Sequence, residues 1–150
     1  MILDERLEFA DAESVTGGTG TSLVGDVVDL ETARNIGVET SLYLVISVDG
    51  AVDSAGNGAA IEFALVSDAA EAISTDGSAT EHASTGAIAQ ADLAAGSQFS
   101  LAVPQGLTNA YEQYLGVLAT ISGEAVTAGT VNAFLTPHPS ANTIYPEGQN

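Results

Sequence analysis

Hydrophobic and polar side chains alternate along much of the chain with the period of two that is typical of β-strands. In residues 41–49, the side chains of Leu42, Leu44, Ile46 and Val48 share one face, and mostly polar side chains occupy the other. The same kind of pattern predicts further strands at residues 23–30, 59–67, 83–89, 98–103, 111–121 and 130–135. Because each strand has one apolar face, the pattern predicts sheets that pack around a shared core.

Turn-forming residues separate these strands, and no segment has the 3.6-residue period of a long amphipathic helix. Asp49-Gly50 and Pro104-Gln105-Gly106 are examples of such turn signals. Short helical turns are expected only at residues 29–36, 68–73 and 90–95. The predicted fold class is all-β, a jelly-roll-like two-sheet sandwich of about seven or eight antiparallel strands.

The two ends of the chain differ in composition from the middle. The segment Gly17-Gly18-Thr19-Gly20 predicts a flexible hinge, and three of the four prolines follow residue 136 and favour extended backbone outside a central strand. We therefore expect an N-terminal segment or arm at residues 1–22, a β-sandwich at 23–135 and an extended tail at 136–150. Each end is either a frayed terminus or an arm that packs on a neighbouring subunit.

Charge narrows the possible partners. The chain has 20 Asp and Glu against only two basic residues, Arg6 and Arg34, which gives a net charge of −18 without any lysine. Such a surface repels phosphate backbones and anionic lipid headgroups, so we expect neither direct nucleic-acid binding nor membrane binding. Acidity also suits plain solubility or a salty environment, and these readings stay open beside a specific role for the charge.

Composition also bears on redox chemistry and location. The chain has no cysteine, which excludes disulfides and cysteine-based zinc sites. The start of the sequence lacks a basic region followed by an apolar run, and nothing approaches the length of a membrane span. We expect synthesis in the cytoplasm, either to remain there or to leave as part of something larger.

No motif in the sequence indicates catalysis, and we predict a protein that is not an enzyme and uses no cofactor or metal. Nucleophile elbows, phosphate loops and complete dinucleotide fingerprints are all missing. His82, in an acidic loop-like context, and His138, between two prolines, are each expected at the surface without a metal-binding partner. Carboxylate pairs of a glycosidase and a structural calcium site are weaker possibilities that the many acidic residues leave open.

The remaining candidates are residues that could contact another protein. Apolar residues near the N-terminus are expected to be buried somewhere, and the two arginines are expected beside carboxylates, within the subunit or across an interface. The candidate interface residues are Ile2, Leu3, Arg6, Leu7, Phe9, Arg34, Ile144 and Tyr145.

Several short blocks, in the same order along the chain, resemble a known family. They are residues 1–4 and 7–16 (MILD and LEFADAESVT), 28–30 and 33–37 (VDL and ARNIG), 42–45 (LYLV), 91–99 (ADLAAGSQF), 114–115 (YL) and 127–131 (TAGTV). Together they resemble the capsid cement, or head decoration, proteins of tailed bacteriophages. The resemblance spans nearly the whole chain, although these blocks are packing and turn motifs without chemistry of their own.

The resemblance implies a jelly roll that binds the outer face of the phage capsid and stabilises it by bridging major capsid proteins. It further implies a virion protein that forms a homodimer, with a homotrimer as the alternative, and that has no catalytic or metal-binding residues. Two other function classes stay open at this stage. One is a carbohydrate- or surface-binding β-sandwich module, and the other is a jelly-roll hydrolase.

Overall fold

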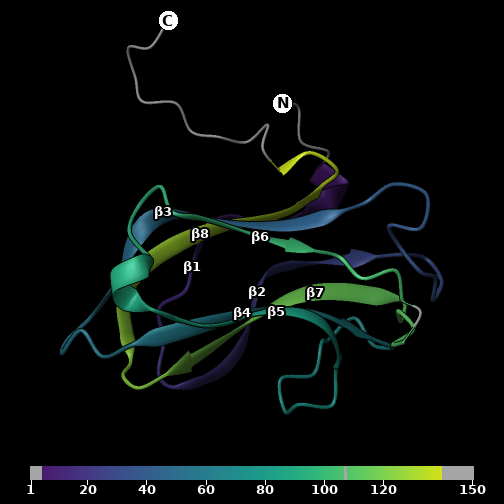
Figure 1. The fold of residues 1–150 in the computed structure, drawn as a ribbon. Helices are drawn as coiled ribbons and strands as arrows, with labels where there is room; N and C mark the ends of the chain where they lie inside the picture. Colours follow the sequence, from purple (N-terminus) through teal and green to yellow (C-terminus); the bar gives the residue numbers. More distant parts are fainter. Residues whose placement is uncertain (1–4, 107, 140–150) are drawn as a thin grey trace, which may run out of the picture.

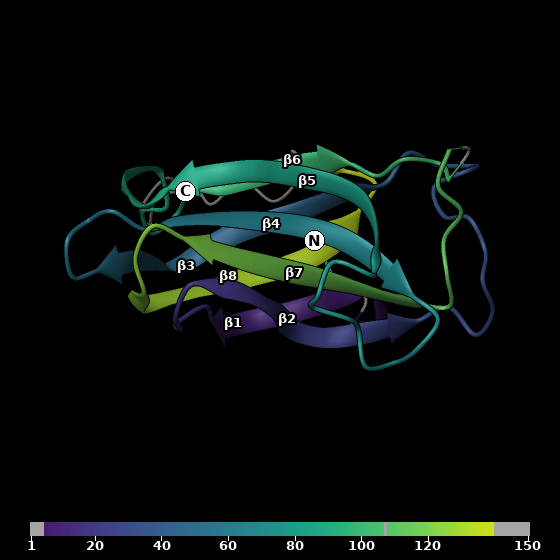
Figure 2. The same ribbon diagram turned by 90° about the horizontal axis from the view of Figure 1, so that it is seen from below.

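The computed structural model describes residues 5–106 and 108–139, which form a sandwich of two antiparallel β-sheets (Figures 1 and 2). The strands are β1 (Glu8–Ser14), β2 (Gly20–Asp29), β3 (Tyr43–Ser54), β4 (Ala60–Asp68), β5 (Thr80–Ala89), β6 (Gln98–Ala102), β7 (Tyr114–Ser122) and β8 (Val126–Thr136). Two short 3-10 turns, η1 (Glu5–Leu7) and η2 (Gln90–Asp92), complete the described elements. The predicted all-β sandwich of about seven or eight antiparallel strands is confirmed, with eight strands in two sheets.

The order of strands in the two sheets is that of a jelly roll. Sheet A has the order β1-β8-β3-β6, and sheet B has the order β2-β7-β4-β5. Antiparallel pairs join the first strand to the last, the second to the seventh, the third to the sixth and the fourth to the fifth. This is the arrangement obtained when one long hairpin is wound into two packed sheets. The edge strands are therefore β1 and β6 in sheet A, and β2 and β5 in sheet B.

The core lies between the sheets and is built from the faces that the alternation predicted. Leu44, Ile46 and Val48 on β3 are fully buried, as are the side chains that face them from sheet B. The largest fully buried side chains are Phe9, Phe63, Leu44, Ile46, Ile61, Leu65, Leu93, Leu115, Val45, Val48, Val117 and Val131. All of these except Val45 belong to one continuous apolar cluster, which makes the sandwich a single packing unit.

Apolar side chains are also buried on the outer faces of both sheets. On sheet B, Ala64, Val66 and Leu118 pack with Ile73 from the loop between β4 and β5. On sheet A, Val45 and Phe134 point away from the core yet are 0% and 5% exposed. The segment after β8 turns back toward this face, since the side-chain amide of Gln98 on β6 donates to the Pro139 carbonyl oxygen at 3.5 Å. Each sheet is therefore partly covered by loop or terminal residues.

The N-terminal boundary of the sandwich differs from our expectation. Residues 8–14, expected in a separate segment, form β1 and pair with β8 at the edge of sheet A. Phe9 is 1% exposed in the core, and this burial anchors the strand. The C-terminal boundary is close to the expected one, because β8 ends at Thr136.

Some local turn predictions were wrong because side chains and strand contacts outweighed local propensity. Asp49-Gly50 does not end β3, which continues through bulges. A Cβ on Gly50 would lie 2.7 Å from Thr130 Oγ1, so this glycine permits close approach of β8. The expected helical turn at 68–73 is a loop, in which the Asp68 carboxylate accepts the N–H groups of Ala70 and Ser74.

The other two expected helical turns had different outcomes. Within residues 29–36 the structure has no helix, because Asp29 Oδ1 accepts the N–H of Glu31 at 2.7 Å and Glu31 adopts a positive φ of 65°. This local turn ends β2 in place of a helix. The turn expected at 90–95 is present in shorter form as η2.

Candidate binding surfaces

The predicted interface residues fall into two groups. Ile2, Leu3, Ile144 and Tyr145 lie outside the described residues. Arg6 and Arg34 are exposed, in η1 and in the loop between β2 and β3, while Leu7 is half-buried against the core. Phe9 is used within its own sandwich and does not contribute to an exposed surface. Of the predicted set, the arginines are thus the described side chains that are exposed at the surface.

The described ends of the chain lie beside each other in sheet A. β1 begins where β8 ends, because Glu8 is paired with Phe134 (Figure 1). Residues 137–139 continue from there, and Pro139 lies within hydrogen-bond distance of Gln98 on the outer face of the sheet. Both predicted arms are therefore attached to the same end of the same sheet, although they come from opposite ends of the sequence.

One long edge of the sandwich is strongly acidic. It consists of β1 and β2, which lie next to each other at the same side of the two sheets (Figure 2). Five carboxylates occur on these two strands: Glu8, Asp11, Glu13, Asp26 and Asp29. Arg6 lines a surface hollow of about 510 Å³ together with Glu8, Asp26, Asp29 and Glu31. The expectation that this arginine lies near carboxylates is met, and we call this side the acidic edge.

The opposite edge, formed by β5 and β6, is nearly neutral. These strands also lie next to each other (Figure 2), and Glu81 is their one carboxylate. β6 has the sequence QFSLA and carries no charge. The 20 carboxylates of the chain are therefore unevenly distributed between the two long edges, which the linear sequence did not reveal. We call the β5–β6 side the neutral edge.

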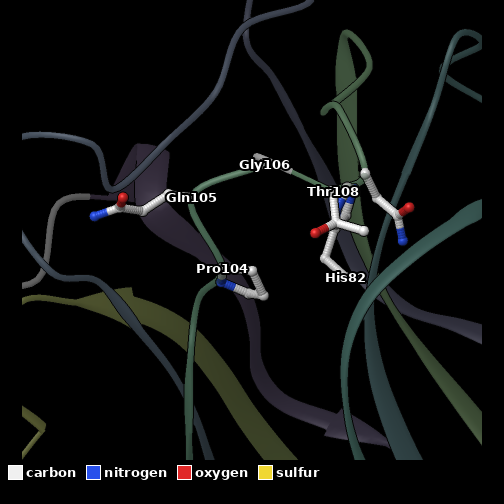
Figure 3. A pocket seen from close by; sticks show the side chains of 6 residues that line it. His82, Pro104, Gln105, Gly106 and Thr108 are labelled. Carbon is white, nitrogen blue, oxygen red and sulfur yellow. The ribbon is translucent and has the colours of Figure 1, made fainter.

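A pocket of about 450 Å³ lies where the loop between β6 and β7 passes beside β5 (Figure 3). It is lined by His82, Pro104, Gln105, Gly106, Thr108 and Asn109. His82 was expected in a surface loop, but it belongs to β5 and is half-buried. Its ring stacks on Tyr111, with ring centroids 3.7 Å apart and an interplanar angle of 16°.

His82 also contacts a buried serine. Its Nε2 lies 2.7 Å from Ser67 Oγ, and this oxygen in turn accepts the N–H of Glu112 at 3.0 Å. A serine beside a histidine is the arrangement of an activated nucleophile, but Ser67 has 0% exposure and no substrate atom can reach it in this conformation. The contacts instead join β4, β5 and the residues just before β7 at one end of the sandwich.

Burial lowers the pKa of His82 below 6.5, although the carboxylate of Glu112 acts in the opposite direction. The imidazole is then neutral at pH 7, so that its Nε2 can accept the Ser67 hydroxyl proton. Burial likewise raises the pKa of Tyr111 to about 12, and its phenol donates to the Pro104 carbonyl oxygen at 2.6 Å. His82 and Tyr111 thus hold the β6–β7 loop in place through contacts between uncharged groups.

We predict that His82→Gln reduces the loss of stability that the protein undergoes on acidification. With the pKa lower in the folded chain, the unfolded chain binds the proton first as the pH falls below 6.5, which favours unfolding. Urea unfolding from about pH 8 to about pH 5 should therefore show the wild type losing more free energy of unfolding than the variant.

The matched control is His82→Phe, which keeps an aromatic ring on Tyr111 but also cannot titrate. Both variants should show the same weaker pH dependence, even where their stabilities at alkaline pH differ. An unchanged pH dependence in both would contradict the assigned role of His82.

A second set of contacts closes the other end of the sandwich. Glu124, in the turn between β7 and β8, accepts the N–H groups of Gly56 and Gly58 at 2.8 and 3.3 Å and the Ser54 hydroxyl at 3.2 Å. These hydrogen bonds lower the pKa of Glu124. The carboxylate thus holds the β3–β4 turn against the β7–β8 turn, a structural use that no sequence motif indicated.

Two further classes of site are absent from the part of the chain that the structure describes. No helix there is long and apolar enough to cross a membrane. Within the same residues, no group of three or more His, Asp or Glu side chains is arranged to hold a metal ion.

Comparison with known proteins identifies the family. The Bbp16 family model matches residues 9–135, from the second residue of β1 to the penultimate residue of β8. The chain belongs to the Bbp16 family. Bbp16 is a family of Bordetella phage proteins, and the match covers both sheets of the sandwich. No curated protein matches the sequence.

Proposed function

We propose that this Bbp16-family chain is a capsid cement protein, which binds the outer face of a phage capsid and stabilises it by bridging major capsid proteins. The observation that carries the proposal is family membership over the whole jelly roll, which assigns the chain to phage proteins. Its partners are the major capsid protein and other copies of itself, as a homodimer or, alternatively, a homotrimer. Nucleic acid and membranes are not among them.

The distribution of charge supports an external location. Packaged DNA is a dense polyanion, and a chain with a net charge of −18 would be repelled from it. A protein that is made in the host cytoplasm and then binds the outer capsid surface avoids this repulsion. The acidic edge also offers a strip of carboxylates to any basic patch on a shell subunit, with Asp11, Asp26 and Asp29 exposed along it.

The placement of the chain ends supports the contact mode. The start of β1 and the end of β8 lie at the same end of sheet A, so segments that continue from these strands can reach the same neighbouring molecule. Arms that cross a subunit boundary are an effective means of bridging, because they add apolar contact at a second site without a new globular interface. The outer side of sheet A is therefore our choice for the shell-facing side.

The direct test is addition of the purified protein to expanded phage shells that lack it. We expect saturable binding at a fixed number of copies per shell, followed by an increase in the temperature at which the shells disrupt. Sedimentation of the shells measures the binding, and calorimetry or light scattering measures the disruption temperature. Absence of binding at saturating protein would overturn the proposal.

Charge-reversal variants sharpen this test. Asp11→Lys and Asp26→Lys change the acidic edge at exposed positions, and Glu81→Lys makes the same change at the neutral edge. If the acidic edge meets basic shell residues, the first two variants weaken binding and its salt dependence, while the third does not. Equal effects of all three would argue against that edge as a contact.

The alternative of a carbohydrate-binding module receives less support from the described surface. The hollow on the outer face of sheet B has a volume of about 210 Å³ and is lined by small, hydroxyl, acidic and aliphatic side chains, such as Thr120, Glu62 and Val66. It lacks the aromatic platform on which sugar rings usually stack. Saturable hits on a glycan array would reverse this preference.

A further inference from the structure

The structure contains one edge strand that is unlike the other three. Bulges interrupt β1, β2 and β5, where the pairing register shifts. β6 pairs with β3 without a shift, from Tyr43 opposite Ala102 to Ser47 opposite Gln98. Bulges and charges are the usual means by which edge strands avoid pairing with another chain. β6 has neither of these features.

The free edge of β6 presents hydrogen-bonding groups in a regular row. Val103 N donates to Leu42 O, and Val48 N donates to Ser97 O, so the odd-numbered residues bond to β3. Because bonding alternates along an antiparallel strand, the N–H and C=O groups of Gln98, Ser100 and Ala102 point away from β3. These three residues are exposed, and β5, the nearest strand on that side, belongs to the other sheet.

We infer that this free edge of β6 is the site where a second copy of the chain pairs, antiparallel, to give a continuous eight-stranded sheet across a twofold axis at Ser100. In this register Ser100 faces Ser100 of the second copy, and Gln98 faces its Ala102. The outward groups of residues 98, 100 and 102 are then paired with one another, in the pattern of a regular antiparallel ladder. A strand that pairs with itself in this way suits the closed symmetry of a homodimer.

The charge distribution favours a second copy of the chain as the partner at this site. Two molecules that each carry −18 repel one another, and the repulsion is smallest where they meet through neutral surface. β5 and β6 carry one carboxylate between them, whereas β1 and β2 carry five. A basic partner would favour the acidic edge, while an identical acidic partner favours the neutral edge.

The opposite side of the sandwich is closed to such pairing by its own geometry. Gly25 on β2 lies against Phe9 on β1, so closely that a Cβ on Gly25 would be 2.0 Å from the Phe9 carbonyl oxygen. The two edge strands there cover one another, and Ala12 on β1 has a positive φ of 49° that bends the strand. Of the two long edges, the β5–β6 side is therefore the one with a strand ready for pairing.

The test measures mass and amide protection on the full chain. Light scattering over a hundredfold range of protein concentration should give twice the 15.0 kDa chain mass for the wild type, which is 30.0 kDa. Ser100→Pro removes an N–H that β3 does not use, and proline is tolerated at such edge positions. This variant should have half the wild-type mass. The amides of residues 98, 100 and 102 should be protected from hydrogen exchange in the wild type alone.

Two further variants keep the inference falsifiable if Ser100→Pro fails to fold. Ser100→Glu retains the backbone but places two carboxylates at the twofold axis, and it should also be monomeric at low salt. Thr19→Glu adds the same charge in the exposed loop between β1 and β2, and it should stay dimeric. A wild-type monomer, a trimer of 45.0 kDa (three times 15.0 kDa), or a dimeric Ser100→Glu would overturn the inference.

This inference deepens the homodimer in the proposed function, yet it can fail separately. A monomer that still binds and stabilises shells would refute β6 pairing and leave the cement role intact. A β6 dimer that does not bind shells would refute the cement role and leave β6 pairing intact.

Discussion

Gly25→Ala is expected to lower the free energy of unfolding by about 2–5 kcal/mol, a large part of the stability of a small domain. Gly25 has a φ of +64°, which costs an L-residue roughly 1–2 kcal/mol. Its added Cβ would also lie 2.0 Å from the Phe9 carbonyl oxygen, a backbone atom that cannot rotate away. Relief of this overlap must move β1 from β2, and such shifts cost about 1–3 kcal/mol more. Urea unfolding monitored by circular dichroism measures the change.

Two other glycines separate the contributions of backbone strain and overlap. Gly86 has a φ of +68° and no atom within 4 Å of the place that a Cβ would occupy, so Gly86→Ala should cost only about 1 kcal/mol. Gly18 has neither a positive φ nor a near neighbour, and Gly18→Ala should change stability by less than about 0.5 kcal/mol. If Gly25→Ala costs no more than Gly86→Ala, the close contact of β1 with β2 is not a constraint on the fold.

The strands and the fold class could be predicted from the sequence, but the pairing of the strands could not. Strands with a continuous apolar face, such as residues 59–67 and 130–135, were predicted because apolar side chains at every second position are typical of a β-strand and do not fit a helix. Their inward residues, among them Phe63 and Val131, are fully buried. The number of strands and the sandwich followed from their spacing. The order in which the strands pair could not be predicted, because no local pattern in the sequence indicates that β1 pairs with β8.

Local signals failed where a distant strand or a side chain decided the conformation. Gly17–Gly20 indicated a hinge, and β1 was therefore separated from the sandwich, although Val15 N donates to Gly129 O and Gly17 N to Val126 O. Gly50 indicated a turn, but it serves a close contact with Thr130. At Gly50, a glycine that permits the close approach of a neighbouring strand has the same local appearance as a glycine needed for a turn.

The candidate surfaces were less predictable than the fold. Their defining property is the contrast between an acidic edge and a neutral edge, which depends on the pairing of strands that are distant in sequence. The sequence did contain one usable signal, since β6 with its neighbours, SQFSLAV, is uncharged in a very acidic chain. His82 was misplaced because its acidic neighbours suggested a loop, whereas its contacts with Ser67 and Tyr111 come from β4 and the residues before β7.

Phe63→Ala is expected to lower the free energy of unfolding by about 3–5 kcal/mol, which is comparable with the whole stability of a marginal domain. Phe63 lies on β4, an interior strand of sheet B, and is 0% exposed in the main core. Truncation removes its apolar contacts and leaves a cavity that the surrounding β-sheets can fill only in part. Urea or thermal unfolding of the variant measures the loss, with Phe63→Leu as the conservative change at about 1 kcal/mol.

Phe99→Ala is the matched control, since it makes the same truncation on β6 at a half-buried position beside the core. Part of that ring is already in water, so the same deletion should cost only about 1–2 kcal/mol. The comparison also bears on β6 pairing, because Phe99 faces the core while Ser100 faces outward. If Phe99→Ala lowers stability without changing the mass of the protein, the core and the self-pairing edge of β6 are separate. Equal losses at Phe63 and Phe99 would instead mean that the edge strand is packed as tightly as the centre of the sandwich.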